Sequence, residues 1–238
     1  MDIILVPGHW LDSSAWDAVT PPLVTAGHTV HPLTLPGLES RDADRSAISL
    51  QDHVDAVVGA IDAVPQDRPV ALVGHSGGGG LVYAASDQRP DRVAHVVYVD
   101  TGPMGEGTAV DATLAEDVVD HDLPAWEELE EEDLVDLTDE LREQFRARAV
   151  PQPGRTVREG HHLTGDADRR RGIPSTVIAC EFTEAMLREL MAQDHFYVAE
   201  LKHLQNYEIV DLPTGHWPMF TKPAELGEAI AAAVAKSA

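Results

Sequence analysis

Residues 70–82 join an apolar strand to an apolar helix through the turn Gly74-His75-Ser76-Gly77-Gly78. The pattern Gly-x-Ser-x-Gly between a strand and a helix is typical of a sharp turn that lifts a serine hydroxyl above the edge of a sheet. Glycines at Gly74 and Gly78 let the two segments approach each other without a clash of Cβ atoms. The turn therefore predicts an α/β fold in which Ser76 is a nucleophile.

A glycine-rich turn after a strand can also bind phosphate. The sequence contains neither the pattern G-x-x-x-x-G-K-[ST] nor G-x-G-x-x-G with an acidic residue about 20 positions further on. The nucleophile interpretation of Ser76 is therefore favoured over a nucleotide site.

Short apolar runs alternate with amphipathic stretches along most of the chain, and this alternation is typical of β-α units that build a parallel sheet. Six strands are expected, at residues 2–6, 29–35, 70–74, 95–100, 176–182 and 207–212. Helices are expected at residues 14–26, 50–64, 77–87, 183–204 and 223–236. The pattern predicts an α/β protein with a doubly wound, mostly parallel six-stranded sheet.

Residues 101–172 interrupt this alternation, because they contain no convincing strand and carry the acidic run 127–133. A run of like charges usually lies on a solvent-exposed helix face. We expect this segment to form a helical cap inserted after the fourth strand. The whole chain, residues 1–238, is expected to form one domain.

The charge of the chain disfavours two classes of partner. Its 41 acidic and 17 basic side chains give a net charge of -24, and such a surface repels nucleic acid and anionic membranes. No apolar run reaches the roughly 20 residues that a membrane-spanning helix needs. The expected partner is a small molecule, with no nucleic acid and no membrane.

Cys180 is the only cysteine, so a disulfide within the chain and a cysteine-based zinc site are both excluded. It lies in a strand-like segment, where a free cysteine is usually a small buried apolar residue. The N-terminal residues show no secretion signal, and a cytoplasmic location is expected. The sequence leaves a monomer and a homodimer equally open.

A serine needs a neighbouring base, and His216 is the best candidate among the 12 histidines. It follows the last predicted strand, at the carboxyl edge of the sheet, where open α/β proteins bind ligands. The competitors are His9, His75, His161 and His162; His75 is expected to point away from Ser76.

The acid that orients the base is expected between the serine and the histidine in chain order. Asp100 ends the strand after the helix of Ser76, so its carboxylate is expected at the same sheet edge. Glu181, and less plausibly Glu184, are alternatives at the end of the next predicted strand. Asp100 is favoured for its strand-end position and shorter side chain.

Two backbone N–H groups are expected to bind the oxyanion, namely those of Gly77 and His9, with the Trp10 N–H as a second choice. Apolar side chains placed to line a substrate pocket are Trp10, Met104, Trp217 and Phe220, with Trp126 as a further candidate from the cap.

These motifs resemble those of the α/β-hydrolase superfamily, in particular its compact plant-type esterase and hydroxynitrile lyase branch. The resemblance covers the whole chain and rests on Leu5-Val6-Pro7-Gly8, Ala15-Trp16, the turn at Ser76 and Gly215-His216. Pro7 replaces the usual histidine of the first motif. The usual Gly-x-x-Asp after the strand at 176–182 is missing, and Asp100 is similar to the acid position of some lipases and dehalogenases.

The resemblance implies hydrolysis of carboxylic esters or lactones through an acyl-enzyme, without cofactor or metal. Small, largely apolar substrates are expected. One alternative is a ligand receptor on the same fold that turns over slowly. Another is a lyase, although Trp217 stands where the resembling lyases use a lysine.

Overall fold

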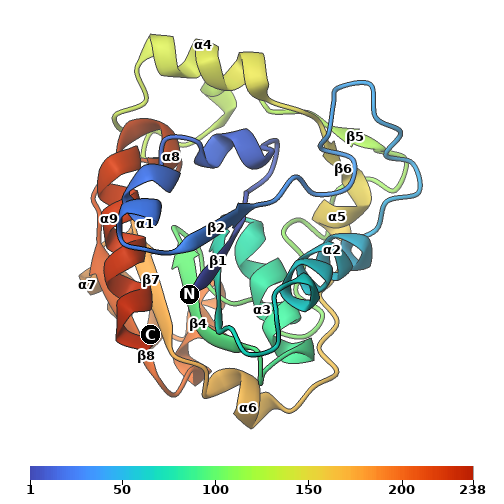
Figure 1. Cartoon of the computed structure of the whole chain (residues 1–238). Helices are drawn as coiled ribbons and strands as arrows, with labels where there is room; N and C mark the ends of the chain where they lie inside the picture. Colours follow the sequence, from blue (N-terminus) through green and yellow to red (C-terminus); the bar gives the residue numbers. More distant parts are fainter. Residues whose placement is uncertain (238) are drawn as a thin grey trace.

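The computed structural model describes residues 1–237 and is built on a six-stranded sheet. Its strands are β1 (Asp2–Val6), β2 (Thr29–Pro32), β3 (Val70–His75), β4 (Val93–Val99), β7 (Ser175–Ala179) and β8 (Tyr207–Asp211). They lie in the order β2-β1-β3-β4-β7-β8, and every neighbouring pair is parallel (Figure 1). All six predicted strands are confirmed, and the sheet is wholly rather than mostly parallel.

Helices cover both faces of the sheet, because side chains of a buried strand alternate between two apolar layers. Ile4 and Val6 pack in the cluster that includes α2 (Leu50–Ala63) and α3 (Gly78–Gln88). Ile3 and Leu5 pack in a second cluster on the opposite face, with α1 (Thr20–Thr25) and α9 (Pro223–Val234). The chain is therefore wound on both sides of the sheet, as predicted.

Two predicted helices are broken into shorter pieces. The segment expected at 14–26 forms η1 (Ser13–Trp16) and then α1, whose first turn contains Pro21 and Pro22. Proline is favoured in a first turn but cannot continue an existing helix, so α1 begins afresh.

The segment expected at 183–204 forms α7 (Glu184–Ala192), η3 (Phe196–Val198) and η4 (Leu201–His203). Asp194 has a positive φ of 54°, which ends the regular helix. The sequence also missed α8 (Pro218–Thr221), and η5 (Ala235–Ser237) follows α9. No helix within residues 1–237 has the length and apolar character that crossing a membrane requires.

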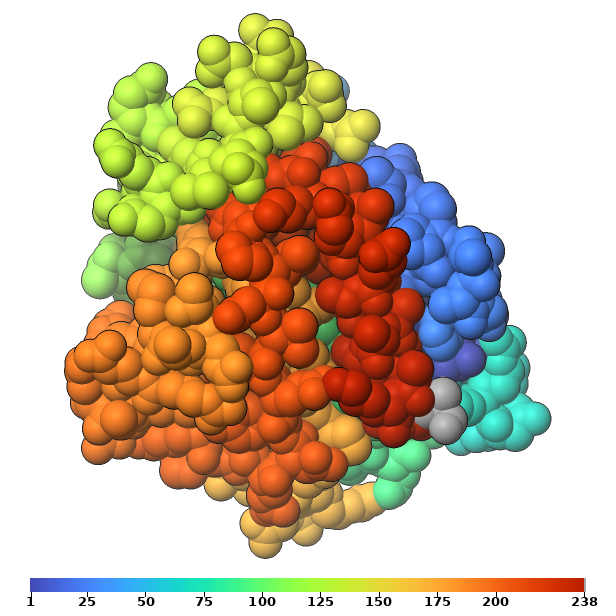
Figure 2. Space-filling model, turned by 90° about the vertical axis from the view of Figure 1, so that its left-hand side faces the viewer, coloured from blue at the N-terminus to red at the C-terminus, as the bar shows by residue number. Residues whose placement is uncertain are grey.

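The segment between β4 and β7 contains η2 (Trp126–Glu128), α4 (Asp139–Arg148), α5 (Gly154–Arg158) and α6 (Ala167–Arg171). It also contains the antiparallel pair β5 (Asp120–His121) and β6 (Gln152–Pro153), which the sequence analysis missed. Strands of two residues are too short to produce an alternating pattern. In Figure 2 the part of this segment from about residue 110 to 150 forms a lobe above the C-terminal residues.

The turn between β3 and α3 requires glycine at position 74. A Cβ on Gly74 would lie 2.5 Å from the Gly78 carbonyl oxygen, which belongs to the backbone and cannot move aside cheaply. We expect Gly74→Ala to lower the free energy of unfolding by about 2 kcal/mol or more. In contrast, Gly59→Ala in the exposed interior of α2, where nothing lies within 4 Å, is expected to raise it by about 0.5 to 1 kcal/mol. Chemical denaturation of both variants measures the difference, and equal effects would contradict the packing argument.

Candidate active site

Ser76, His216 and Asp100 form a continuous hydrogen-bonded chain at the carboxyl edge of the sheet. His216 Nε2 lies 2.9 Å from Ser76 Oγ, and His216 Nδ1 lies 2.7 Å from Asp100 Oδ2. Ser76 has a positive φ of 51°, the strained conformation expected at this turn. The arrangement can transfer the serine proton to an imidazole that a carboxylate orients.

Asp100 follows β4 and uses both of its carboxylate oxygens. Oδ2 faces His216, while Oδ1 accepts hydrogen bonds from the backbone N–H groups of Cys180 at 2.9 Å and Glu181 at 3.0 Å. Burial alone would raise the pKa of Asp100, but the contact with His216 and the two N–H donors outweigh it, and the pKa lies below its usual value. Asp100 is therefore the ionised carboxylate of the hydrogen-bonded Ser76–His216–Asp100 group.

Glu181, the rival for the acid role, lies further from the imidazole. Its Oε2 is 3.7 Å from His216 Nδ1, and its buried Oε1 has no hydrogen-bond partner. Burial, followed by the nearby Asp133 and Asp100 carboxylates, raises the pKa of Glu181 to about 10. Glu181 is therefore protonated near neutral pH, and one negative charge, that of Asp100, faces the base.

The same three side chains are also the one group in residues 1–237 whose spacing could suit a metal ion. Potential ligand atoms of Asp100, Glu181 and His216 lie within 4.8 Å of one another. Both ring nitrogens of His216 already face Asp100 and Ser76. The geometry favours proton transfer between Ser76 and His216 over coordination of a cation.

The raised pKa of Glu181 makes stability depend on pH. The unfolded chain ionises Glu181 above about pH 4.5, whereas the folded chain keeps it neutral up to about pH 10, so folding becomes less favourable as pH rises between these values. We expect Glu181→Gln to gain stability over the native chain as pH rises from 5 to 9, by about 2 kcal/mol at the upper end. Denaturation at several pH values tests this, with Glu228→Gln on the exposed side of α9 as control; a gap that does not widen would contradict it.

Three backbone contacts hold the loop that carries His216. The imidazole of His75 lies with Nε2 2.7 Å from the His216 carbonyl oxygen, and its ring centroid is 4.9 Å from that of the His216 ring. Burial lowers the pKa of His75 to about 3, so this ring is neutral and donates through Nε2. On the cap side, the His216 N–H donates to the Asp133 carbonyl and the Gly215 N–H to the Val135 carbonyl. The base is therefore fixed between the β3 turn and the cap.

The loop after β1 lies directly against the serine turn. A Cβ on Gly8 would lie 2.9 Å from Ser76 Cβ, and a Cβ on Gly77 would lie 2.5 Å from His9 Nε2. The Trp10 N–H faces Gln152 Oε1 at 3.4 Å, whereas the structure records no acceptor for the N–H groups of His9 and Gly77. Their place beside Ser76 suits the oxyanion role that the sequence analysis assigned to them.

A cavity of about 510 Å³ opens beside Ser76 and His216. Residues from the β4 loop and from the segment after α7 form most of its wall, among them Met104, Glu106, Phe196, Tyr197 and Glu200. Its size is within the range of small-molecule sites. Of the predicted pocket residues, Met104 lines this cavity.

The predicted aromatic pocket residues lie in other surroundings. Trp217 and Phe220 pack against Phe145 of α4, with ring centroids 5.1 and 5.0 Å apart, and Trp126 joins the same cluster. The Trp10 indole N–H donates to the His121 carbonyl. These rings attach the cap to the sheet layer rather than face Ser76, because α4 supplies an apolar surface that the sequence pattern did not reveal.

The family assignment follows from the match of the chain to a sequence model described as the alpha/beta hydrolase family, over residues 3–229. This chain belongs to that family. The alpha/beta hydrolase is also similar to solved structures over nearly its whole length. An extracellular alpha/beta-hydrolase from a Paenibacillus species has a TM-score of 0.73 at 21% identity, covering 100% of this chain and 98% of that one. A methylesterase from Arabidopsis has a TM-score of 0.71 at 18% identity, covering 99% of both chains.

Curated relatives match this alpha/beta hydrolase over shorter stretches. It is 32% identical to Methylesterase 8 of Arabidopsis thaliana over 98 residues, 40% of this chain and 36% of the relative. It is 32% identical to a pyrethroid hydrolase of Sphingobium wenxiniae over 98 residues, 41% of this chain and 35% of the relative. The match thus spans well under half of the length of these relatives.

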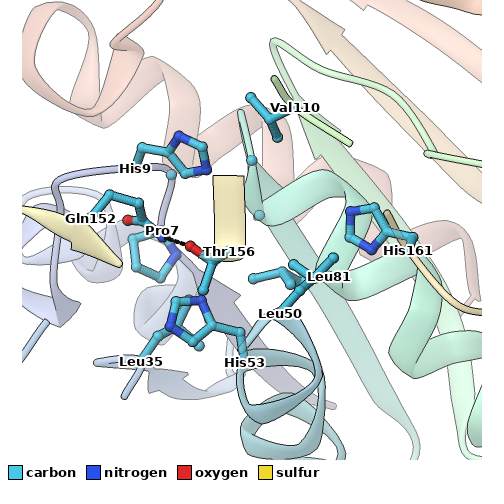
Figure 3. Close-up of a pocket in the computed structure, with 13 residues that line it drawn as sticks. Pro7, His9, Leu35, Leu50, His53, Leu81, Val110, Gln152, Thr156 and His161 are labelled. Atoms are coloured by element: carbon cyan, nitrogen blue, oxygen red, sulfur yellow. Dashed lines mark hydrogen bonds between the residues drawn. The ribbon is translucent and has the colours of Figure 1, made fainter. Parts of the chain in front are cut away.

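A second, smaller cavity of this alpha/beta hydrolase lies beside Gly77, with space for about one water molecule, 10 Å³. Figure 3 shows three imidazoles around it, those of His9, His53 and His161. Burial, followed by other histidines, lowers the pKa of His9 to about 3, and burial lowers that of His161 to about 4. All three rings are held neutral, since burial also lowers the pKa of His53.

Proposed function

We propose that this alpha/beta hydrolase cleaves carboxylic esters or lactones through an acyl-enzyme formed on Ser76. The observation that carries the proposal is the Ser76–His216–Asp100 chain, which opens onto a cavity of small-molecule size. A serine hydroxyl is a weak nucleophile on its own, and a base at 2.9 Å is what it needs.

The reaction proceeds in two halves. His216 removes the Ser76 proton as Oγ bonds to the acyl carbon, and the Gly77 and His9 N–H groups stabilise the resulting oxyanion. The imidazolium, held by Asp100, then protonates the leaving alcohol as its C–O bond breaks. In the second half His216 takes a proton from water as the water oxygen bonds to the acyl carbon. The bond between that carbon and Ser76 Oγ then breaks, His216 returns its proton to Ser76 Oγ, and the carboxylic acid leaves.

The names of several relatives support ester cleavage. They include methylesterases of Arabidopsis, a pyrethroid hydrolase and a carbendazim hydrolyzing esterase of Nocardioides, the last 30% identical over 48% of this chain. Since these matches cover only parts of the relatives, the activity here rests chiefly on the geometry of the site. A lyase is less favoured, because buried Trp217 follows the base where the resembling lyases carry a lysine.

Kinetics with a chromogenic ester separate an enzyme from a receptor. Steady release of p-nitrophenol from p-nitrophenyl butyrate over many enzyme equivalents supports the proposal. A burst of one equivalent followed by lasting modification of Ser76 or His216, detected by mass spectrometry, would instead identify a slow receptor on the same fold.

We expect a preference for uncharged esters over anionic ones. The wall of the main cavity includes Glu106 and Glu200 and has no lysine or arginine among its described residues, and the net charge of the chain is -24. An ester with a free carboxylate therefore meets repulsion without an anchoring cation. The expected kcat/KM is about tenfold or more lower than for the neutral amide analogue of equal size, measured at low salt. Equal values for the two substrates would contradict this prediction.

A further inference from the structure

Glu200 is a firmly held polar side chain of the main cavity that the proposed reaction does not use. It lies between η3 and η4 and lines the same cavity as Ser76 and His216, with its side chain 13% exposed. Its Oε1 accepts hydrogen bonds from the Tyr83 hydroxyl at 2.5 Å and from Arg171 Nε at 3.0 Å. The carboxylate is thus fixed in position before any ligand arrives.

The second oxygen of Glu200 retains capacity to accept a hydrogen bond. Oε2 receives only the longer contact from Arg171 Nη2, at 3.3 Å, whereas a carboxylate can accept about four hydrogen bonds in all. It faces Gly105, another cavity residue, since a Cβ there would lie 3.2 Å from Oε2. Burial raises the pKa of Glu200, but Arg171 and Tyr83 outweigh it and the net pKa is lowered, so the group is ionised.

A purely structural role for Glu200 would be to fasten α6 to the body of the protein. That attachment already exists, because Arg170 of α6 pairs with Asp87 of α3 and both side chains are buried. The Arg170 guanidinium also lies 4.9 Å above the Tyr83 ring. The pair of Arg171 with Glu200 joins α6 to the segment between η3 and η4 and, in addition, presents an ionised oxygen to the cavity beside Ser76.

We propose that Glu200 is a specificity-determining acceptor that binds an O–H or N–H group of the substrate at a distance from the scissile ester. The preferred substrates are then esters whose remote end carries a hydroxyl, amide or ammonium group. This inference rests on the proposed function and narrows its substrate class. Arg171, the cation that pairs with Glu200, is not part of the described cavity wall, and its contact with Oε2 is the longer of its two, so that oxygen can still accept from a donor group on the substrate.

The test compares p-nitrophenyl esters of ω-hydroxyalkanoic acids with alkanoate esters of the same chain length, in which a methyl group replaces the hydroxyl. The measured quantity is the ratio of their kcat/KM values across a series of chain lengths. At the length that reaches Glu200, the native protein is expected to favour the hydroxy ester about tenfold, the difference appearing mainly in KM. Damage to the fold lowers both rates and leaves the ratio unchanged.

Three variants assign this preference to one carboxylate. Glu200→Leu removes the acceptor and is expected to abolish the hydroxyl preference, while Glu200→Gln, which keeps one oxygen, is expected to reduce it severalfold. Glu106→Gln removes a carboxylate from the exposed rim of the same cavity and is expected to leave the ratio unchanged. An unchanged ratio in both Glu200 variants, or an equal loss in Glu106→Gln, overturns the inference.

The same measurements keep the inference distinct from the proposed function. If the native protein hydrolyses the alkanoate esters but shows no hydroxyl preference at any length, the inference is wrong and the esterase proposal stands. If it hydrolyses neither series and is not labelled by a fluorophosphonate, the esterase proposal is wrong and the inference falls with it.

Discussion

Ser76→Ala is expected to lower kcat/KM for a p-nitrophenyl ester by about 10⁴-fold or more. The substitution removes the oxygen that bonds to the acyl carbon, and what remains is binding and the oxyanion donors. Its effect on stability is expected to be small, because the only hydrogen bond of Ser76 Oγ that the structure records is the one to His216. Loss of turnover without loss of folding therefore identifies a nucleophile.

Ser86→Ala is the matched control for this experiment. Ser86 is buried in α3, and its hydroxyl donates to the Tyr83 carbonyl rather than to a catalytic group. A fluorophosphonate is expected to label the native chain and Ser86→Ala but not Ser76→Ala. Equal labelling of all three proteins would remove Ser76 from the nucleophile role.

Asp100→Asn is expected to reduce kcat/KM by about 10³- to 10⁴-fold at neutral pH. The Cys180 and Glu181 N–H groups bind Asp100 Oδ1, so an asparagine places its oxygen there and turns its NH₂ group toward His216 Nδ1. That group forces Nδ1 to accept, which leaves Nε2 protonated and unable to take the serine proton. The imidazole is then present but in the wrong tautomer.

Glu181→Gln is the companion variant, and its activity is expected to stay within about tenfold of the native value. A neutral amide resembles the protonated carboxyl group that burial maintains at this position. Full activity in Asp100→Asn together with collapse in Glu181→Gln would exchange the roles of the two acids. Rates measured from pH 6 to 9 for both variants give the comparison.

The strand-end residues were predictable because their local sequence context determines where they emerge. Ser76, Asp100 and His216 each follow an apolar run, and parallel strands bring such positions to one edge of the sheet. The helices were less predictable at their ends: the break near Asp194 depends on a single left-handed residue. The spacing of apolar residues in the sequence does not indicate where such a residue will occur.

The pocket was the least predictable part, because the cap decides which side chains face it. Trp217 and Phe220 sit beside the catalytic loop in sequence but turn toward Phe145, a partner more than 70 positions away. Glu200 belongs to no motif, and its importance arises only from its contacts with Tyr83 and Arg171. A residue of this kind could be suspected from sequence only by knowing which distant segments meet.

The carbonyl groups of Asp133 and Val135 accept hydrogen bonds from the N–H groups of His216 and Gly215, so the lobe over the site also supports the loop that carries the imidazole. A large outward movement of residues 133–136 to admit a bulky substrate would break those hydrogen bonds and free the loop that positions His216 at the same time. The β4 loop and the segment after α7, which form most of the cavity wall, make none of these bonds, and Phe196 in that segment is 82% exposed. Replacing this lobe with a different one would then change not only which molecules fit the cavity but also whether His216 is held where it can act as a base.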